Sequence, residues 1–345
     1  MKYFKSDNTA AVAPEIMAAL HEANQGFALA YGDDPWTAQL QERFSTLFDH
    51  EVKVFPVATG TAANALALAT LVPPWGAILT HEESHIVRDE CGAPEFMTHG
   101  ARLLLDTEPD AKLTAGGLHR ALDALPLSVH TVQPRALSIT QATELGTVYS
   151  PDELRSLTSA AHERGLHVHM DGARFANAVA HLGCAPADLT ARAGVDVLSF
   201  GATKNGAMAA EAVIFFNQDL VTDFEFRRKR AAHLFSKMRF LSAQLLAYID
   251  NNLWLTLATR ANAMAAEIGA AAPSRLLQPV QANEVFVRLG EQNIKQLREA
   301  GFAFYDWGSL HSGEARFVVA WHQDPKEVES LVRSLRALES ESADG

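Results

Sequence analysis

The chain has 345 residues, 48% of them hydrophobic, and a formal net charge of −12. This length suits two domains better than one, and the negative charge argues against general binding to nucleic acid or anionic membranes. Cys91 and Cys184 lack the spacing of a disulfide framework or a zinc site, so we expect no metal centre and a cytoplasmic location. No apolar run reaches the roughly 18 residues of a membrane helix.

Short apolar runs alternate with longer helical stretches between about residues 55 and 216. This alternation predicts a mostly parallel sheet covered by helices. Helices are expected to begin near Thr61, Ser150 and Asp188. The expected strands are 54–57, 77–79, 138–140, 167–170, 195–200 and 212–216.

One helix start has a complete capping signature. Ser150 can accept a hydrogen bond from the first turn, Pro151 suits the first helical position, and Glu153 completes a capping box. Beyond about residue 225 the pattern changes to a long helical stretch at 237–271 and strand-like runs at 284–289 and 315–321. We therefore predict a large domain at 1–240, with an N-terminal arm at 1–14, and a smaller α/β domain at 241–345.

Lys204 stands in a loop of small residues between two apolar strands, in VDVLSFGATKNGAMAAEAVIFF. A lysine at a strand end beside a cleft is what pyridoxal phosphate (PLP) chemistry requires, because the cofactor aldehyde forms an imine with the protein and exchanges it for the substrate amine. Seen alone, it also fits a solvated loop residue.

The segment HVHMDGARFANA delivers Asp171 at the end of a strand and Arg174 three residues later. A carboxylate there can keep a pyridine nitrogen protonated, and the arginine can bind a carboxylate through two parallel hydrogen bonds. A helix-capping aspartate and a surface arginine are the alternative interpretation.

Two further segments fit an anionic, aromatic cofactor. In FPVATGTAANALALATL, the N–H groups of Gly60 and Thr61 would point to an anion at a helix N-terminus, although an ordinary capped helix has the same pattern. In THEESHIVRDECGA, His85 could lie over the cofactor ring with support from Glu90; a solvated loop is the rival.

Together these segments resemble the threonine aldolases of the fold-type I PLP superfamily, which also includes aromatic amino-acid β-eliminating lyases. The resemblance implies an α/β, aspartate-aminotransferase-like fold, with a large domain built on a mixed, mostly parallel sheet and a smaller C-terminal α/β domain. The segments that carry it are KSDNTA around Ser6, YGDDP at 31–35, ATGTAAN at 58–64, SHIVRDECGA at 84–93, HMDGARFANA at 169–178, TK at 203–204 and RFVVAW at 316–321.

The resemblance also implies roles for individual residues. Lys204, next to Thr203, would be the Schiff-base lysine, and Asp171 would pair with the pyridine nitrogen. The implied phosphate ligands are Gly60 and Thr61, and His85 would stack on the ring. The substrate carboxylate would be received by Ser6, Arg174 and Arg316, with Tyr31 near the cleft or near a neighbouring subunit's site in a homodimer or homotetramer.

Two departures from the family pattern leave questions open. The family usually has Asn-Thr-His after the middle strand, whereas this chain has QATELGTVYS, with Glu144 in the place of the histidine. The catalytic base is therefore His85 or Glu144, directly or through a water. The segment RRKRAAHLFSKMRF leaves the cross-subunit phosphate contact open between Arg230, Lys237 and a neighbour.

The expected activity is PLP-dependent retro-aldol cleavage of L-threonine, L-allo-threonine or related β-hydroxy-α-amino acids such as phenylserine, to glycine and an aldehyde. A PLP-dependent β-eliminating lyase or aminotransferase of the same fold is the alternative enzyme. A non-catalytic PLP-fold binding protein is the alternative of another class, although it would have no need of an imine-forming lysine.

Overall fold

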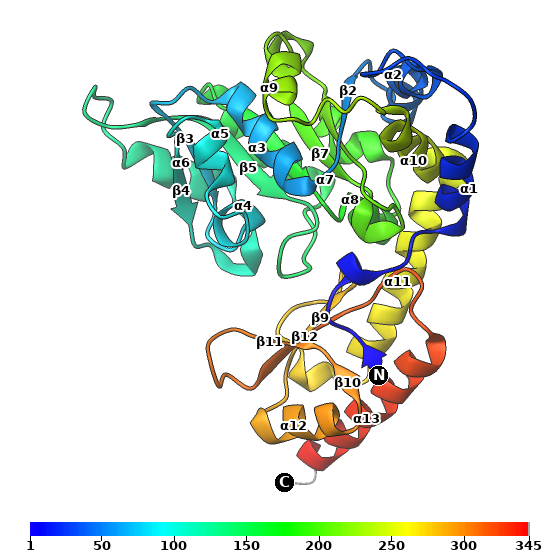
Figure 1. Cartoon of the computed structure of the whole chain (residues 1–345). Coiled ribbons are helices and arrows are strands. Elements are labelled where there is room, and N and C mark those ends of the chain that lie inside the picture. Colours follow the sequence, from blue (N-terminus) through cyan, green and yellow to red (C-terminus); the bar gives the residue numbers. More distant parts are fainter. Residues whose placement is uncertain (344–345) are drawn as a thin grey trace.

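The structure, a computed structural model, describes residues 1–343. It is built on a seven-stranded sheet, which lies with its covering helices in the upper lobe of Figure 1. Strand β8 runs antiparallel to both of its neighbours, and the other pairings are parallel. The mostly parallel α/β sheet predicted from the sequence is confirmed. The strand order is β2 (Lys53–Val57), β8 (Glu211–Phe215), β7 (Val197–Gly201), β6 (His167–Gly172), β5 (Gln133–Thr140), β3 (Gly76–His81) and β4 (Arg102–Asp106).

Both faces of this sheet are covered, since successive strand residues point to opposite sides. Val197 belongs to the core under α3 (Gly60–Leu71), α4 (His85–Arg88) and α9 (Phe224–Arg230). Leu198, the next residue, belongs to the larger core on the other face. The helices that contribute to this larger core are α1 (Pro14–Ala23), α2 (Pro35–Leu47), α6 (Ala115–Asp123), α7 (Pro151–Glu163), α8 (Phe175–Leu182), α10 (Arg239–Ile249) and the first half of α11 (Leu253–Gly269). The short helix α5 (Ala93–Met97) packs beside α3.

A third core lies in the lower lobe of Figure 1. It contains the second half of α11, a three-stranded antiparallel sheet and two more helices. The start of the chain also lies here, because β1 (Lys2–Tyr3) pairs with β10 (Phe302–Ala303) and Phe4 is fully buried in this core. The sheet order is β11 (Tyr305–Trp307), β12 (Glu314–Val318), β9 (Glu284–Arg288), and the helices are α12 (Glu291–Glu299) and α13 (Pro325–Ala343).

The local predictions had mixed outcomes. The capping box at Ser150 is confirmed, with Oγ of Ser150 accepting from N–H of Glu153 at 3.2 Å and Oε2 of Glu153 accepting from N–H of Ser150 at 2.6 Å. The helix expected near Asp188 is wrong, because only two short 3₁₀ turns, Pro186–Leu189 and Ala191–Ala193, form there. The stretch 237–271 is also not one helix, since Asn251 and Asn252 adopt positive φ between α10 and α11.

The domain boundary near residue 240 stays a prediction. Within the described residues, no helix is both long and apolar enough to cross a membrane.

Candidate active site

Most of the side chains predicted to form the site gather at the carboxyl ends of the parallel strands, which is where ligands bind in open α/β sheets. Two adjoining cavities occupy this edge. The inner cavity has a volume of about 440 Å³ and reaches the N-terminus of α3; the outer cavity, of about 810 Å³, extends towards β9, β11 and β12. The residues that line both are Asn8, His85, Glu144, Arg174 and Lys204.

Lys204 follows β7 in a 3₁₀ turn, Thr203–Asn205. The turn is anchored by Asn205, whose Nδ2 donates to Oη of Tyr248 and to the carbonyl of Trp254, both at 2.8 Å. Gly206 then turns the chain back with a φ of 109°, a conformation that favours glycine. These contacts fix the backbone on which the amine of Lys204 extends into the cavity.

Asp171 lies at the end of β6 and is 4% exposed. Its Oδ2 accepts from Nδ2 of Asn64 at 2.7 Å, and its Oδ1 accepts from N–H of Ala173 at 2.9 Å. The adjacent strand end must be glycine, because a Cβ on Gly201 would lie 2.7 Å from Cα of Ala173. The close approach of β6 and β7 therefore brings Asp171 and Lys204 into one cavity.

His85 belongs to a network that ends at Asp171. Nδ1 of His85 lies 2.9 Å from Oε1 of Glu90, and the same oxygen accepts from Nδ2 of Asn64 at 2.8 Å. The hydrogen bond that Nδ1 of His85 donates to Glu90 raises the pKa of His85, although burial opposes the rise. Burial in turn raises the pKa of Glu90. The ligand atoms of His85, Glu90 and Asp171 lie within 4.8 Å of one another, a spacing that could hold a cation, so the expected absence of a metal stays a prediction.

Glu144 lies in the loop after β5 and points into both cavities. Its Oε1 accepts from backbone N–H of His85 at 2.6 Å and from Oγ1 of Thr140 at 3.0 Å. Burial, and then the charge of Asp171, raise the pKa of Glu144 to about 7. A carboxylate with this pKa can accept and return a proton near neutral pH.

The N-terminus of α3 borders the inner cavity. Oγ1 of Thr59 caps N–H of Ala62 at 3.2 Å, and the carbonyl of Thr59 accepts from N–H of Ala63 at 3.1 Å. The first-turn N–H groups of Gly60 and Thr61 have no carbonyl one turn earlier to bind. They are available to an anion, which the helix dipole also stabilises.

Arg174 and Arg316 reach the outer cavity from the two lobes. Nε and Nη2 of Arg174 donate to Oδ2 and Oδ1 of Asp7 at 2.8 and 3.0 Å. Burial by itself would lower the pKa of Arg174, but Asp7 and Glu284 hold it above its usual value. The guanidinium of Arg316 lies 5.2 Å from the ring centre of Trp307. Ser6 also lines this cavity, and its Oγ accepts from N–H of Asn8 at 3.2 Å.

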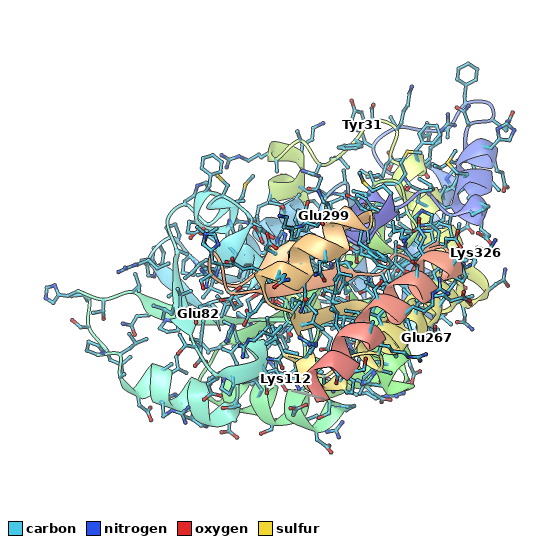
Figure 2. All side chains as sticks on the ribbon, turned by 90° about the horizontal axis from the view of Figure 1, so that it is seen from below. Tyr31, Glu82, Lys112, Glu267, Glu299 and Lys326 are labelled. Atoms are coloured by element: carbon cyan, nitrogen blue, oxygen red, sulfur yellow. The ribbon has the colours of Figure 1, made fainter. Side chains whose placement is uncertain are left out.

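The three residues considered for a neighbouring subunit's site lie outside both cavities. Tyr31 is 51% exposed, lies under Nζ of Lys229 at 4.5 Å, and is seen at the periphery of the molecule in Figure 2. Arg230 and Lys237 are also exposed. Their expected contribution to a neighbouring subunit's site remains a prediction.

Several buried polar residues of the site were not identified from the sequence. Asn64 belongs to the segment 58–64, but the sequence suggested no role for it. Asp7 was predicted only as part of the N-terminal arm, and Glu284 only as part of the strand-like run 284–289. Glu211 is another: its Oε2 accepts from N–H of Ala202 at 3.1 Å, and burial raises its pKa to about 7. The signal available in the sequence was the polar residue type at these positions, since a charged residue in an apolar strand usually has a partner.

Comparisons with known proteins identify the family of the chain. The sequence profile of the beta-eliminating lyase family matches residues 3–292. The chain is 46% identical to a low specificity L-threonine aldolase of Pseudomonas aeruginosa, over 96% of both chains, and 44% identical to one of another Pseudomonas species, over 98% of both. A threonine aldolase structure from Leishmania major superposes with a TM-score of 0.92 at 29% identity, covering 98% of this chain and 100% of that one. A serine palmitoyltransferase variant of S. paucimobilis with a bound PLP–myriocin aldimine has a TM-score of 0.71 at 15% identity, covering 99% of this chain and 88% of that one, which shows the fold alone.

Proposed function

Because the chain belongs to the beta-eliminating lyase family, with low specificity L-threonine aldolases among its relatives, we propose that it cleaves L-threonine, L-allo-threonine or related β-hydroxy-α-amino acids to glycine and an aldehyde. One observation carries the proposal: Lys204, Asp171, His85 and Glu144 share a cavity that opens towards Arg174 and Arg316. An amine, a buried carboxylate, two candidate bases and two guanidinium groups are the parts that the reaction needs.

The inner cavity fits pyridoxal phosphate, whose phosphate, pyridine nitrogen and aldehyde each find a partner. The free N–H groups of Gly60 and Thr61 suit the phosphate, and a Cβ on Gly60 would meet no atom within 4 Å, so the space beside the helix N-terminus is open. Asp171 suits the pyridine nitrogen, and Lys204 suits the aldehyde. When bound, the cofactor supplies an electron sink for the bond that breaks at Cα of the substrate.

The chain's own residues bind the substrate and move its protons. Arg174, Arg316 and Ser6 receive the carboxylate, which fixes the amine towards Lys204. The hydroxyl proton at Cβ passes to His85 or to Glu144, directly or through a water. Both oxygens of Asp171 are held by hydrogen bonds, which preserves its orientation through the reaction. Thr203 supports the lysine turn by accepting from N–H of Ala210 at 3.2 Å.

Product analysis tests this function. Incubation with threonine or phenylserine should release glycine and one equivalent of aldehyde, whereas tyrosine or serine should give neither ammonia nor a keto acid. Release of ammonia would instead favour a β-eliminating lyase, and a protein inert towards all four would favour a binding role.

Covalent trapping tests the lysine. Borohydride should abolish the absorbance of the bound cofactor at the violet edge of the visible spectrum, and mass spectrometry should find the reduced adduct on Lys204. The exposed residue Lys237 provides the matched control, because Lys237→Ala should leave the adduct intact while Lys204→Ala removes it. An adduct on Lys237 would contradict the assignment.

The active assembly is expected to be a homodimer or homotetramer located in the cytoplasm. Apolar side chains are exposed on the segment around Tyr31, with Phe27 fully exposed and Leu29 71% exposed. Such a patch fits contact with a second copy of the chain. Sedimentation of the holoenzyme would measure the assembly.

A further inference from the structure

The side chain of Glu284 is a buried carboxylate to which no described residue donates a hydrogen bond. It begins β9, is 2% exposed and lines the outer cavity. Its Oε2 lies 3.3 Å from Nη1 of Arg174, and its Oε1 lies 3.9 Å from Nη1 of Arg316. Neither oxygen accepts a hydrogen bond within the described part of the chain. Because buried polar atoms are usually satisfied, this side chain is suited to a partner that arrives with a ligand.

The position of Glu284 follows from the antiparallel pairing of β9 with β12. Glu284 pairs with Val318, and Arg316 stands two residues away on the same strand. Residues so related share one face of a sheet. The carboxylate therefore lies on the face from which Arg316 extends, between that arginine and Arg174 of the upper lobe.

The charges around Glu284 are balanced before any substrate binds. Both carboxylate oxygens of Asp7 accept hydrogen bonds from Arg174. Glu284 is therefore the remaining anion opposite the two guanidinium groups. A substrate carboxylate would be one negative charge in excess. Burial already raises the pKa of Glu284, although Arg174 and Arg316 oppose the rise. The titratable and charged groups that face Glu284 or its two arginines are Asp7 in the N-terminal arm, Glu144 after β5, Arg174 after β6, Lys204 after β7 and Arg316 on β12.

We propose that Glu284 takes up a proton when a substrate carboxylate enters the outer cavity, releasing the two arginines to bind that carboxylate. The proton comes from solvent and adds to one Oε atom, and no other bond forms or breaks. The neutral acid then has an O–H to donate to a substrate oxygen. This inference rests on the proposed function, because it takes Arg174 and Arg316 as the receptor of the substrate carboxylate.

Proton uptake links carboxylate affinity to pH. The second anion raises the pKa of Glu284 further in the complex, so the complex binds more protons than the free protein does. Affinity is then constant below the pKa of the free protein. It falls by about tenfold per pH unit between the free and bound pKa values, as expected for one linked proton.

Calorimetry with propionate tests the proposal on the holoenzyme. Propionate has the carboxylate but no amine, so its binding requires neither exchange at Lys204 nor carbon–carbon cleavage. Titrations at one pH, in two buffers of different ionisation enthalpy, give the number of protons taken up. We expect about one proton per propionate for the unaltered protein where Glu284 is ionised in the free state.

Glu284→Gln keeps the shape and supplies a permanent N–H donor. This variant should bind propionate with almost no proton uptake and with an affinity that no longer falls as pH rises. Glu314→Gln is the matched control, because Glu314 is paired with Arg288 at 2.8 Å on the same sheet and does not line the outer cavity. It should retain the uptake of the unaltered protein.

The outcomes separate this inference from the proposed function. Absence of uptake in the unaltered protein, persistent uptake in Glu284→Gln, or no propionate binding at any pH would each overturn the role of Glu284. A threonine cleavage assay run in parallel distinguishes the two failures. Cleavage without proton uptake rejects this inference alone, whereas uptake without cleavage of any β-hydroxy amino acid rejects the activity and leaves a proton-linked carboxylate site.

Discussion

Replacing Glu144 by glutamine tests whether this carboxylate has taken over proton transfer at the substrate hydroxyl. Both hydrogen bonds of Glu144 end on Oε1, from N–H of His85 and from Oγ1 of Thr140. Neither of these two bonds uses Oε2, which is therefore the atom left to take a proton. Glutamine can keep the two bonds but cannot act as a base. We expect kcat to fall about 100-fold or more, which corresponds to about 2.7 kcal/mol, with KM nearly unchanged.

The measurement follows aldehyde release from threonine by coupled reduction with NADH. Because Glu144 acts as a base only when ionised, and its pKa is raised to about 7, kcat of the unaltered enzyme should rise with pH through about 7. This rise of kcat with pH should be absent from the residual activity of Glu144→Gln. The comparison variant is His85→Asn, which removes the imidazole held by Glu90. If Glu144→Gln cleaves at the normal rate and His85→Asn nearly abolishes cleavage with cofactor retained, the base is His85, and Glu144 only positions it through its backbone N–H.

Two further predictions concern the carboxylate site and the scaffold. Arg316→Ala should lower kcat/KM for threonine at least about tenfold, since a charged hydrogen bond contributes about 1.5 to 3 kcal/mol; steady-state kinetics measure this, and unchanged kinetics would contradict the assigned substrate orientation. Arg174→Ala is a poorer probe, because it would also leave Asp7 buried without its charged partner, with only Asn283 still donating to it, at a cost of about 3 to 5 kcal/mol. Ser150→Ala should reduce the free energy of unfolding by about 1 kcal/mol through loss of the capping box. Urea denaturation at fixed protein concentration measures this change, and Ser156→Ala, in the same helix, is the control.

The sheet was predictable where its strands are continuous apolar runs, as at 195–200 and 212–216. The strand β4 was missed because it is a short edge strand that is only partly buried, with the charged residues Arg102 and Asp106 at its two ends. The break between α10 and α11 was missed for another reason. The apolar pattern continues through it, and the positive φ of Asn251 and Asn252 depends on how the two helices pack, which helical periodicity does not encode.

The placement of candidate site residues was predictable when they follow a strand directly. Asp171 and Lys204 do so, and parallel strands end at one edge of the sheet, which brings them together. The partners that hold them were not predictable, because contact between distant segments decides them. Asn64 meets Asp171 across 107 positions of sequence, and Asp7 meets Arg174 across 167. Only the folded chain joins those segments.

The burial of the site's carboxylates explains how a cavity with many anionic side chains can also accept an anionic substrate. The cations Lys204, Arg174 and Arg316 share their cavities with many carboxylates, and a substrate carboxylate adds one more. Burial raises the pKa of Glu144 and of Glu211 to about 7, and raises the pKa of Glu284. Protonation is therefore accessible near neutral pH, and the charge of the site can adjust without further basic residues. A carboxylate with a pKa near neutral pH can hold the proton of the substrate hydroxyl while the aldehyde leaves and give it up afterwards. A fully solvated glutamate does this poorly.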